Sequence, residues 1–120
     1  MARTPVVTRD MVPEQFREAF DELTANTGGT ITGVGQVLKE KIPNLLLVAV
    51  EPSASPALRG GVTKPHAIQG IGAGFIPQIL DTDLLDRILA CEDGVAFETS
   101  RELARQEGIL AGLSAGANVW

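Results

Sequence analysis

Hydrophobic and polar positions along the chain alternate between helical spacing and short, continuous apolar runs. Between residues 12 and 23, apolar side chains recur every three or four positions opposite a charged face, which predicts an amphipathic helix ending near Asn26. The same spacing returns over about Thr30–Lys41 and predicts a second helix, which Pro43 ends. The positions this second helix is expected to bury are Ile31, Val34, Val37 and Leu38.

The later part of the chain continues the alternation. The run Leu45–Val50 is apolar throughout, which is typical of a strand buried on both faces of a parallel sheet. A second buried strand is expected over Ile88–Cys91, followed by a third helix over about Asp93–Glu107 that Gly108 ends. Ile109–Ala111 is expected to form a last strand, before a helix of small residues. The inward positions of the third helix are Ala96, Phe97, Ser100, Leu103 and Ala104.

Between the first two expected strands lies a long connection. Residues 52–74 are rich in Pro, Gly, Ser and Ala, and long connections inside compact domains usually serve a function. Residues 76–80 are expected to add a short turn of helix. Because helices alternate with buried strands, the sequence predicts an α/β fold.

Composition narrows the possible partners. The chain has 120 residues with a formal net charge of −5, which argues against a nucleic acid or an anionic membrane as partner. Its single cysteine, Cys91, is expected to be a buried thiol and fits a reducing compartment. No apolar stretch reaches the length of a membrane span, and the N-terminus lacks the apolar core of a signal peptide. A cytoplasmic location is therefore expected.

The strongest candidate for chemistry is the stretch Thr27, Gly28, Gly29 and Thr30, directly ahead of the second helix. Adjacent glycines allow a tight turn, and the helix start leaves unpaired N–H groups and a positive dipole end at the same place. With two threonine hydroxyls, the stretch is a candidate phosphate cradle. It matches neither the P-loop nor the GxGxxG pattern, and from chemistry alone a plain helix start is the more frequent explanation of such a turn.

Five stretches together resemble the C-terminal half of cysteine synthase (O-acetylserine sulfhydrylase), in that family's order and spacing. The resemblance runs from Thr27 to Trp120. It implies a fragment of a pyridoxal-phosphate-dependent fold type II domain, like the tryptophan synthase β subunit, preceded by an extra N-terminal amphipathic helix. The five stretches are Thr27–Gly35, Val48–Pro52, Pro65–Pro77, Leu80–Asp86 and Glu107–Ala117.

The resemblance implies roles for particular residues. The four residues of the candidate cradle align with the loop that holds the cofactor phosphate, and Ser114 aligns with the serine that hydrogen-bonds the pyridine nitrogen. Gly70, Ile71 and Gly72 align with the loop beside the substrate entrance. From the residues alone, Ser114 could instead cap the last helix, and His66 is expected to be structural. The implied reaction replaces the acetate of the small-molecule substrate O-acetylserine with sulfide, which gives cysteine.

The chain also departs from the family pattern. The lysine that binds the cofactor covalently lies in an N-terminal half that has no match here, and Lys39, Lys41 and Lys64 do not align with it. Residues 1–26 do not match, so the chain is expected to divide into that segment and a partial domain over residues 27–120.

The first expectation is thus a truncated cysteine synthase-like protein, inactive in isolation, that binds no cofactor covalently. Assembly into a homodimer is left open. Two alternatives stay open. One is a non-catalytic phosphate- or partner-binding module derived from the same fold. The other is an unstable fragment without activity of its own.

Overall fold

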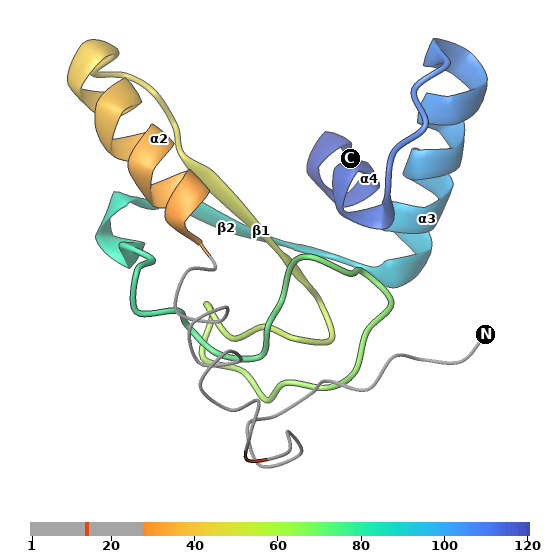
Figure 1. Cartoon of the computed structure of the whole chain (residues 1–120), viewed down its shortest axis with the longest axis horizontal. Coiled ribbons are helices and arrows are strands. Elements are labelled where there is room, and N and C mark those ends of the chain that lie inside the picture. The colour runs from red at the N-terminus through yellow and green to blue at the C-terminus, as the bar shows by residue number, and fades with distance from the viewer. Residues whose placement is uncertain (1–13, 15–27) are drawn as a thin grey trace. The chain divides into compact units, whose positions relative to one another are not determined.

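The computed structural model describes residue 14 and residues 28–120 (Figure 1). The helix expected to end near Asn26 lies outside the described residues. The helices of the described part are α2 (Gly29–Lys41), α3 (Asp93–Glu102) and α4 (Leu113–Val119), with a 3₁₀ turn η3 (Thr82–Leu84) and a π-helical turn η4 (Leu103–Glu107). The strands are β1 (Val48–Pro52) and β2 (Arg87–Cys91). None of the described helices is long and apolar enough to cross a membrane.

The described residues pack into two compact units. Unit 1 comprises Val50–Phe75 and Ile88–Trp120, and unit 2 comprises residues 28–49 and Ile76–Arg87. The boundary between the units falls within both strands. Each unit therefore has its own contacts, and each contributes different candidate residues.

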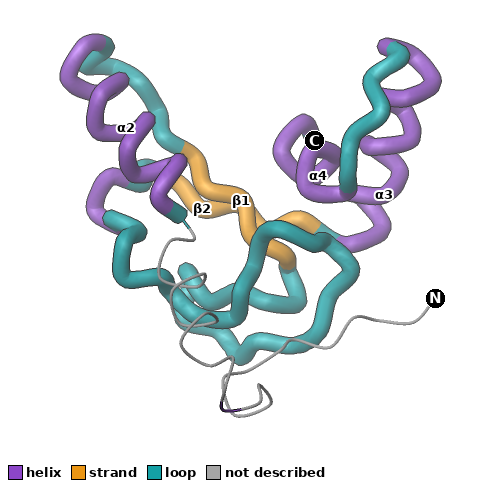
Figure 2. The backbone as a smooth tube through the Cα atoms, viewed as in Figure 1, coloured by secondary structure: helices purple, strands orange, loops and turns teal. Residues whose placement is uncertain are grey.

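The two strands form one parallel pair (Figure 2). At one end the Asp86 N–H donates to the Leu47 carbonyl over 2.9 Å, and at the other the Ser53 N–H donates to the Cys91 carbonyl over 2.8 Å. Because both partners advance along the chain in the same direction, the strands run parallel. Parallel strands alternating with helices confirm the predicted α/β class.

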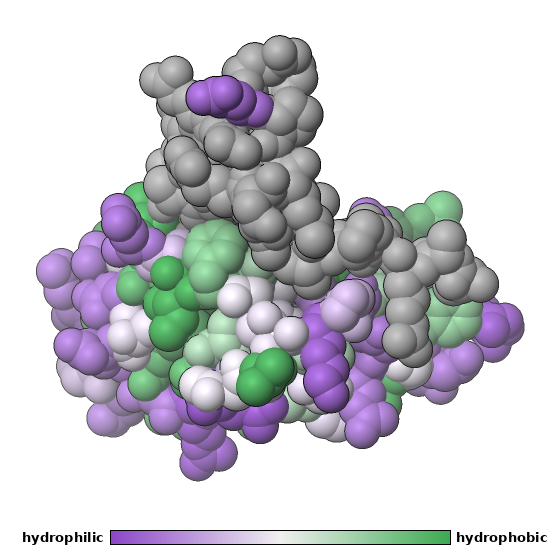
Figure 3. All heavy atoms as spheres, turned by 90° about the horizontal axis from the view of Figure 1, so that it is seen from below, coloured by the Kyte–Doolittle hydropathy of each residue, from purple (hydrophilic) through white to green (hydrophobic). Residues whose placement is uncertain are grey.

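Two details of the predicted strands are wrong. The first strand begins at Val48 instead of Leu45, because the Leu47 N–H donates to the carboxylate of Asp86. Burial on both faces is not found either: Leu46 is 61% exposed and alternate residues of β2 face solvent. Nothing in the described part of the chain covers those side chains, and hydrophobic residues lie exposed among hydrophilic ones on the face drawn in Figure 3.

In unit 2, α2 has the predicted bounds to within one residue. Gly35 is buried at the contact with Leu47, where an added Cβ would lie 2.5 Å from the Leu47 Cδ2 atom. Because the helix rests on this glycine, Val34 and Val37 are turned aside and are each 50% exposed, so their predicted burial is wrong. The short helix expected over residues 76–80 is a single turn, with the Leu80 N–H donating to Pro77.

In unit 1, a small core of Ile68, Cys91, Ala96 and Ala117 lies between β2, α3 and α4. Cys91 is fully buried, as predicted. The third predicted helix is α3 continued by η4, and Gly108 ends it in the left-handed conformation with φ 68°.

Two other expectations for unit 1 are wrong. Phe97 does not point inward but lies partly exposed under the guanidinium of Arg101, 5.4 Å from the ring centroid. Ile109–Ala111 forms no strand, and Leu110 is 91% exposed. A strand needs a neighbouring strand for its backbone hydrogen bonds. Among the described residues none pairs with this segment, and the Ile109 N–H donates instead to the Leu103 carbonyl.

Candidate cofactor site

The start of α2 has the geometry of an anion cradle. Gly28 occupies the N-cap position with φ 95°, a left-handed conformation that a residue with a side chain rarely adopts. No side chain caps the helix, and its first turn carries no acidic residue. The N–H groups of this turn have no intrahelical acceptors, so they suit a phosphate. Gly29 and Thr30 open the helix as predicted, and Thr27 lies outside the described residues.

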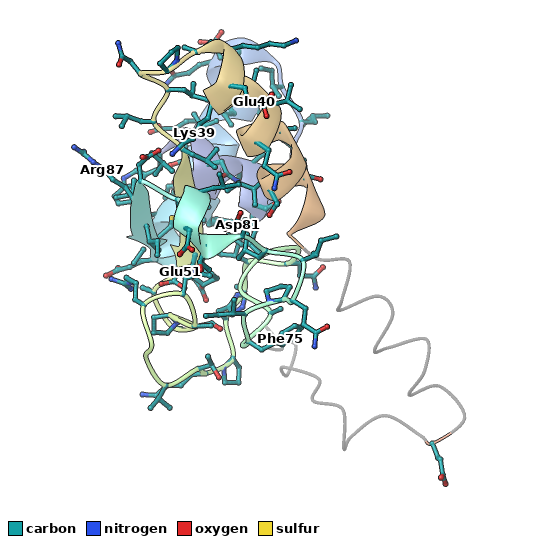
Figure 4. All side chains as sticks on the ribbon, turned by 90° about the vertical axis from the view of Figure 1, so that its left-hand side faces the viewer. Lys39, Glu40, Glu51, Phe75, Asp81 and Arg87 are labelled. Carbon is teal, nitrogen blue, oxygen red and sulfur yellow. The ribbon has the colours of Figure 1, made fainter. Side chains whose placement is uncertain are left out.

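The segment just before η3 holds this cradle in place. An added Cβ on Gly28 would lie 3.2 Å from the Cβ of Leu80, so the turn packs directly on that side chain. The N–H of Asp81, a residue labelled in Figure 4, donates to the Thr32 hydroxyl in the first turn of α2 over 3.1 Å. Sequence reasoning did not assign either Leu80 or Asp81 to the site. The matching stretch Leu80–Asp86 was the signal that could have identified them.

Farther along α2, in its last turn, Lys39 forms an ion pair with Asp86, and their charged atoms lie 2.7 Å apart. The Leu47 N–H, and after it Lys39, binds the charged carboxylate and lowers the pKa of Asp86 below its usual value of 3.8. Lys39 is thus engaged in an ion pair, while Lys41 and Lys64 are exposed.

Ser114 and the glycine loop lie together in unit 1. An added Cβ on Gly70 would lie 4.0 Å from the Ser114 hydroxyl oxygen. Ser114 follows the first residue of α4, whose N-cap is Gly112 without a side-chain cap bond, so the interpretation of Ser114 as the cap is wrong. Gly70 and Gly72 both have left-handed backbones, with φ 92° and 66°, while Ile71 packs on the core of unit 1.

The predicted site residues therefore form two groups. Gly28, Gly29 and Thr30 belong to unit 2, and Gly70, Ile71, Gly72 and Ser114 belong to unit 1. The backbone N–H groups of the first group are donors of the kind that suit a phosphate, and the Ser114 hydroxyl can hydrogen-bond an aromatic nitrogen. Each unit by itself thus offers donors of a kind that pyridoxal phosphate can use. Within residue 14 and residues 28–120, no group of three or more His, Cys, Asp or Glu side chains could hold a metal ion.

The chain is similar to known proteins over most of its length. The sequence model of a family described as "Pyridoxal-phosphate dependent enzyme" matches residues 7–120. Cysteine synthase of Staphylococcus aureus (strain N315) is 53% identical over 94 residues, which are 78% of this chain and 30% of that protein. The chain thus spans less than a third of the length of that relative.

Solved structures are also similar to this chain. Cysteine synthase from Entamoeba histolytica superposes with a TM-score of 0.73 at 41% identity, over 75% of this chain and 27% of that one. A hydrogen sulfide-producing enzyme from Fusobacterium nucleatum superposes with a TM-score of 0.73 at 50% identity, over 77% of this chain and 31% of that one. Both sequence identities are far higher than those at which a structural likeness indicates a shared fold alone.

Proposed function

The chain belongs to the family of pyridoxal-phosphate dependent enzymes, and we propose that it carries the phosphate cradle and the ring-nitrogen serine of a cysteine synthase-like site. One observation supports the proposal: Gly28, which the resemblance assigns to the cofactor-phosphate loop, has a left-handed backbone and precedes the uncapped first turn of α2. The parent reaction in this proposal is replacement of the acetate of O-acetylserine by sulfide.

Each residue has a physical role in this proposal. The N–H groups at the start of α2, beside Gly28 and Thr30, bind the phosphate as charge-assisted donors. The Ser114 hydroxyl hydrogen-bonds the ring nitrogen without protonating it, since a hydroxyl is far less acidic than a carboxylic acid. Pyridoxal phosphate, when bound, supplies a ring that withdraws electrons for elimination and replacement at the substrate's β-carbon. Gly70 has no side chain, which leaves room for the substrate next to Ser114, while Gly72 packs against Pro52.

We further propose that the 120-residue chain alone binds phosphate without catalysing the reaction. None of its three lysines aligns with the lysine that the family uses, and Lys39 is engaged with Asp86. This supports the second candidate function, a non-catalytic phosphate-binding module. Charge-assisted bonds of about 1.5–3 kcal/mol each, less the entropy of association, give an affinity no better than about millimolar.

A titration of inorganic phosphate against backbone amide NMR shifts tests the cradle. The amides of residues 28–31 are expected to move in the parent chain and to stay still in Gly28→Val, where the turn would be strained and would meet Leu80. Gly33→Val is the matched control, because Gly33 lies in the same helix with nothing within 4 Å of an added Cβ. Phosphate binding that survives in Gly28→Val, or that moves only other amides, contradicts the proposal.

A companion variant tests the role proposed for Ser114. Ser114→Ala is expected to leave the phosphate titration unchanged, because Ser114 belongs to unit 1 and is assigned to the ring end. The same variant is expected to weaken binding of pyridoxal phosphate relative to inorganic phosphate. Equal effects on both ligands would contradict the assignment of Ser114.

A further inference from the structure

The carbonyl of Gly72 is held by two side chains from outside its own loop. The Ser55 hydroxyl donates to it over 3.2 Å, and Nε2 of His66 lies 2.9 Å from it. A carbonyl oxygen accepts at two lone pairs, so both are used here. Neither Ser55 nor His66 is among the residues assigned to the site above, and all three residues belong to unit 1.

Ser55 is itself rigidly placed. It is fully buried, its N–H donates to the Pro52 carbonyl over 2.9 Å, and its own carbonyl accepts from Ala57 over 3.0 Å. Gly72 lies against the same proline, since an added Cβ would be 2.5 Å from the Pro52 Cγ atom. The hydroxyl therefore ties the loop to the end of β1.

The bond between His66 and Gly72 fixes which ring nitrogen carries the proton. A carbonyl oxygen can only accept, so Nε2 of His66 carries the proton in the bond to Gly72. The other nitrogen, Nδ1, is buried and has no hydrogen-bond partner among the described residues. Burying an acceptor without a partner is unfavourable. The bond that Nε2 makes to the Gly72 carbonyl offsets this cost and explains why the ring lies here.

This bond matters because the loop is otherwise free to take many shapes. Gly70, Gly72 and Gly74 all have left-handed backbones, and glycine loses more conformational freedom than any other residue when it is fixed. The loop also begins beside the Ser114 hydroxyl. We propose that Ser55 and His66 are positioning residues, which hold the glycine loop Gly70–Gly74 in the one conformation that faces Ser114 and so shape the substrate side of the site.

The hydrogen-bond arrangement can be tested on the unaltered chain. His66 is the only histidine of the sequence, so ¹⁵N-labelled imidazole signals belong to it alone. For the neutral ring, the expected tautomer is Nε2–H, with a hydrogen-bonded ring proton that exchanges slowly with solvent. The opposite tautomer, or a ring that rotates freely between the two, overturns the proposal.

Variants then test the effect on the loop. His66→Leu and Ser55→Ala each remove one donor, and we expect amide hydrogen exchange over residues 70–74 to become about tenfold faster in each. His66→Gln keeps a terminal N–H donor and is expected to return exchange to near the parent rate. Lys64→Ala, at an exposed neighbouring position, is the control and should change nothing. Loop exchange at the parent rate in folded His66→Leu, or no recovery in His66→Gln, overturns the proposal.

The link from this loop to substrate rests on the proposed function, but the two can fail separately. Pyridoxal phosphate binding, followed by its absorbance, tests the proposed function. If pyridoxal phosphate does not bind while the tautomer and the exchange rates are as expected, the proposed function is wrong and the positioning roles stand. If pyridoxal phosphate binds but loop exchange is unchanged in the variants, the positioning roles are wrong and the proposed function stands.

Discussion

Gly116 is the position where a single methyl group should do the most damage in unit 1. On α4, it faces the backbone of α3: an added Cβ would overlap the Ala96 carbonyl oxygen and would lie 2.8 Å from the Ser100 nitrogen. Backbone atoms within a helix cannot rotate away as a flexible side chain can. To restore an ordinary contact of 3.4 Å with Ser100, α4 would have to move by at least 0.6 Å, and the overlap with Ala96 demands more.

The magnitude follows from two opposing effects. Overpacking of this severity costs about 3 kcal/mol, the upper end of the range for an added methyl group in a packed core. Alanine is better than glycine inside a helix by about 1 kcal/mol, which offsets part of that cost. The net loss of about 2 kcal/mol corresponds to a roughly 30-fold increase in the open population of α4.

Amide hydrogen exchange of Ala117–Trp120 measures this opening directly, whether or not the whole chain unfolds in one step. Gly116→Ala is expected to speed exchange about 30-fold. Gly94→Ala is the matched control, because nothing lies within 4 Å of a Cβ at this position in α3. In this variant the exchange of Ala117–Trp120 should be unchanged or slower. If α4 exchanges in Gly116→Ala at the parent rate or below, the tight approach of α3 and α4 is refuted.

Three further predictions follow from the charges and thiols of the chain. Acidification should release Asp86: its pKa is lowered, so the stability it gives is present above the ordinary value of 3.8 and is lost as pH falls through the folded value. The Leu47 amide shift should therefore titrate with a midpoint below 3.8 and be flat in Asp86→Asn; a midpoint at or above 3.8 would contradict this. Burial raises the pKa of the Cys91 thiol, so it should react with a thiol reagent far more slowly than free cysteine until denaturant is added, and equal rates would refute this. Reduction of a mixture with pyridoxal phosphate should attach no stoichiometric label to one lysine; a single label that disappears with Lys39→Arg, Lys41→Arg or Lys64→Arg would disprove this.

Helix bounds were the most predictable part of the fold. The bounds of α2 and the end of η4 at Gly108 follow from local signals, namely apolar periodicity, proline and a glycine that can take φ 68°. The anion cradle is local in the same sense, since Gly28 and the first turn of α2 are adjacent in sequence. Such features depend on a few consecutive residues and need no knowledge of distant neighbours.

Burial was less predictable because it depends on what lies opposite. Val34 has the right spacing for a core position but is half exposed, and Leu110 is apolar but lies in solvent. The reverse also occurs: Glu51 is buried, because the Leu58 N–H and the Arg59 side chain bind its carboxylate. Periodicity shows which side chains could share a face, but it does not show which faces find a partner.

The candidate residues of the two units are held by separate sets of contacts, which differ in how far they reach along the sequence. Leu80 and Asp81 hold the cradle at Gly28 within unit 2. In unit 1 the glycine loop depends on Ser55 and His66, which lie 17 and 6 residues before the carbonyl they bind. Only the spacing of glycines is visible in the sequence of that loop. The choice among the many conformations that glycines allow is made by side chains that no local pattern identifies.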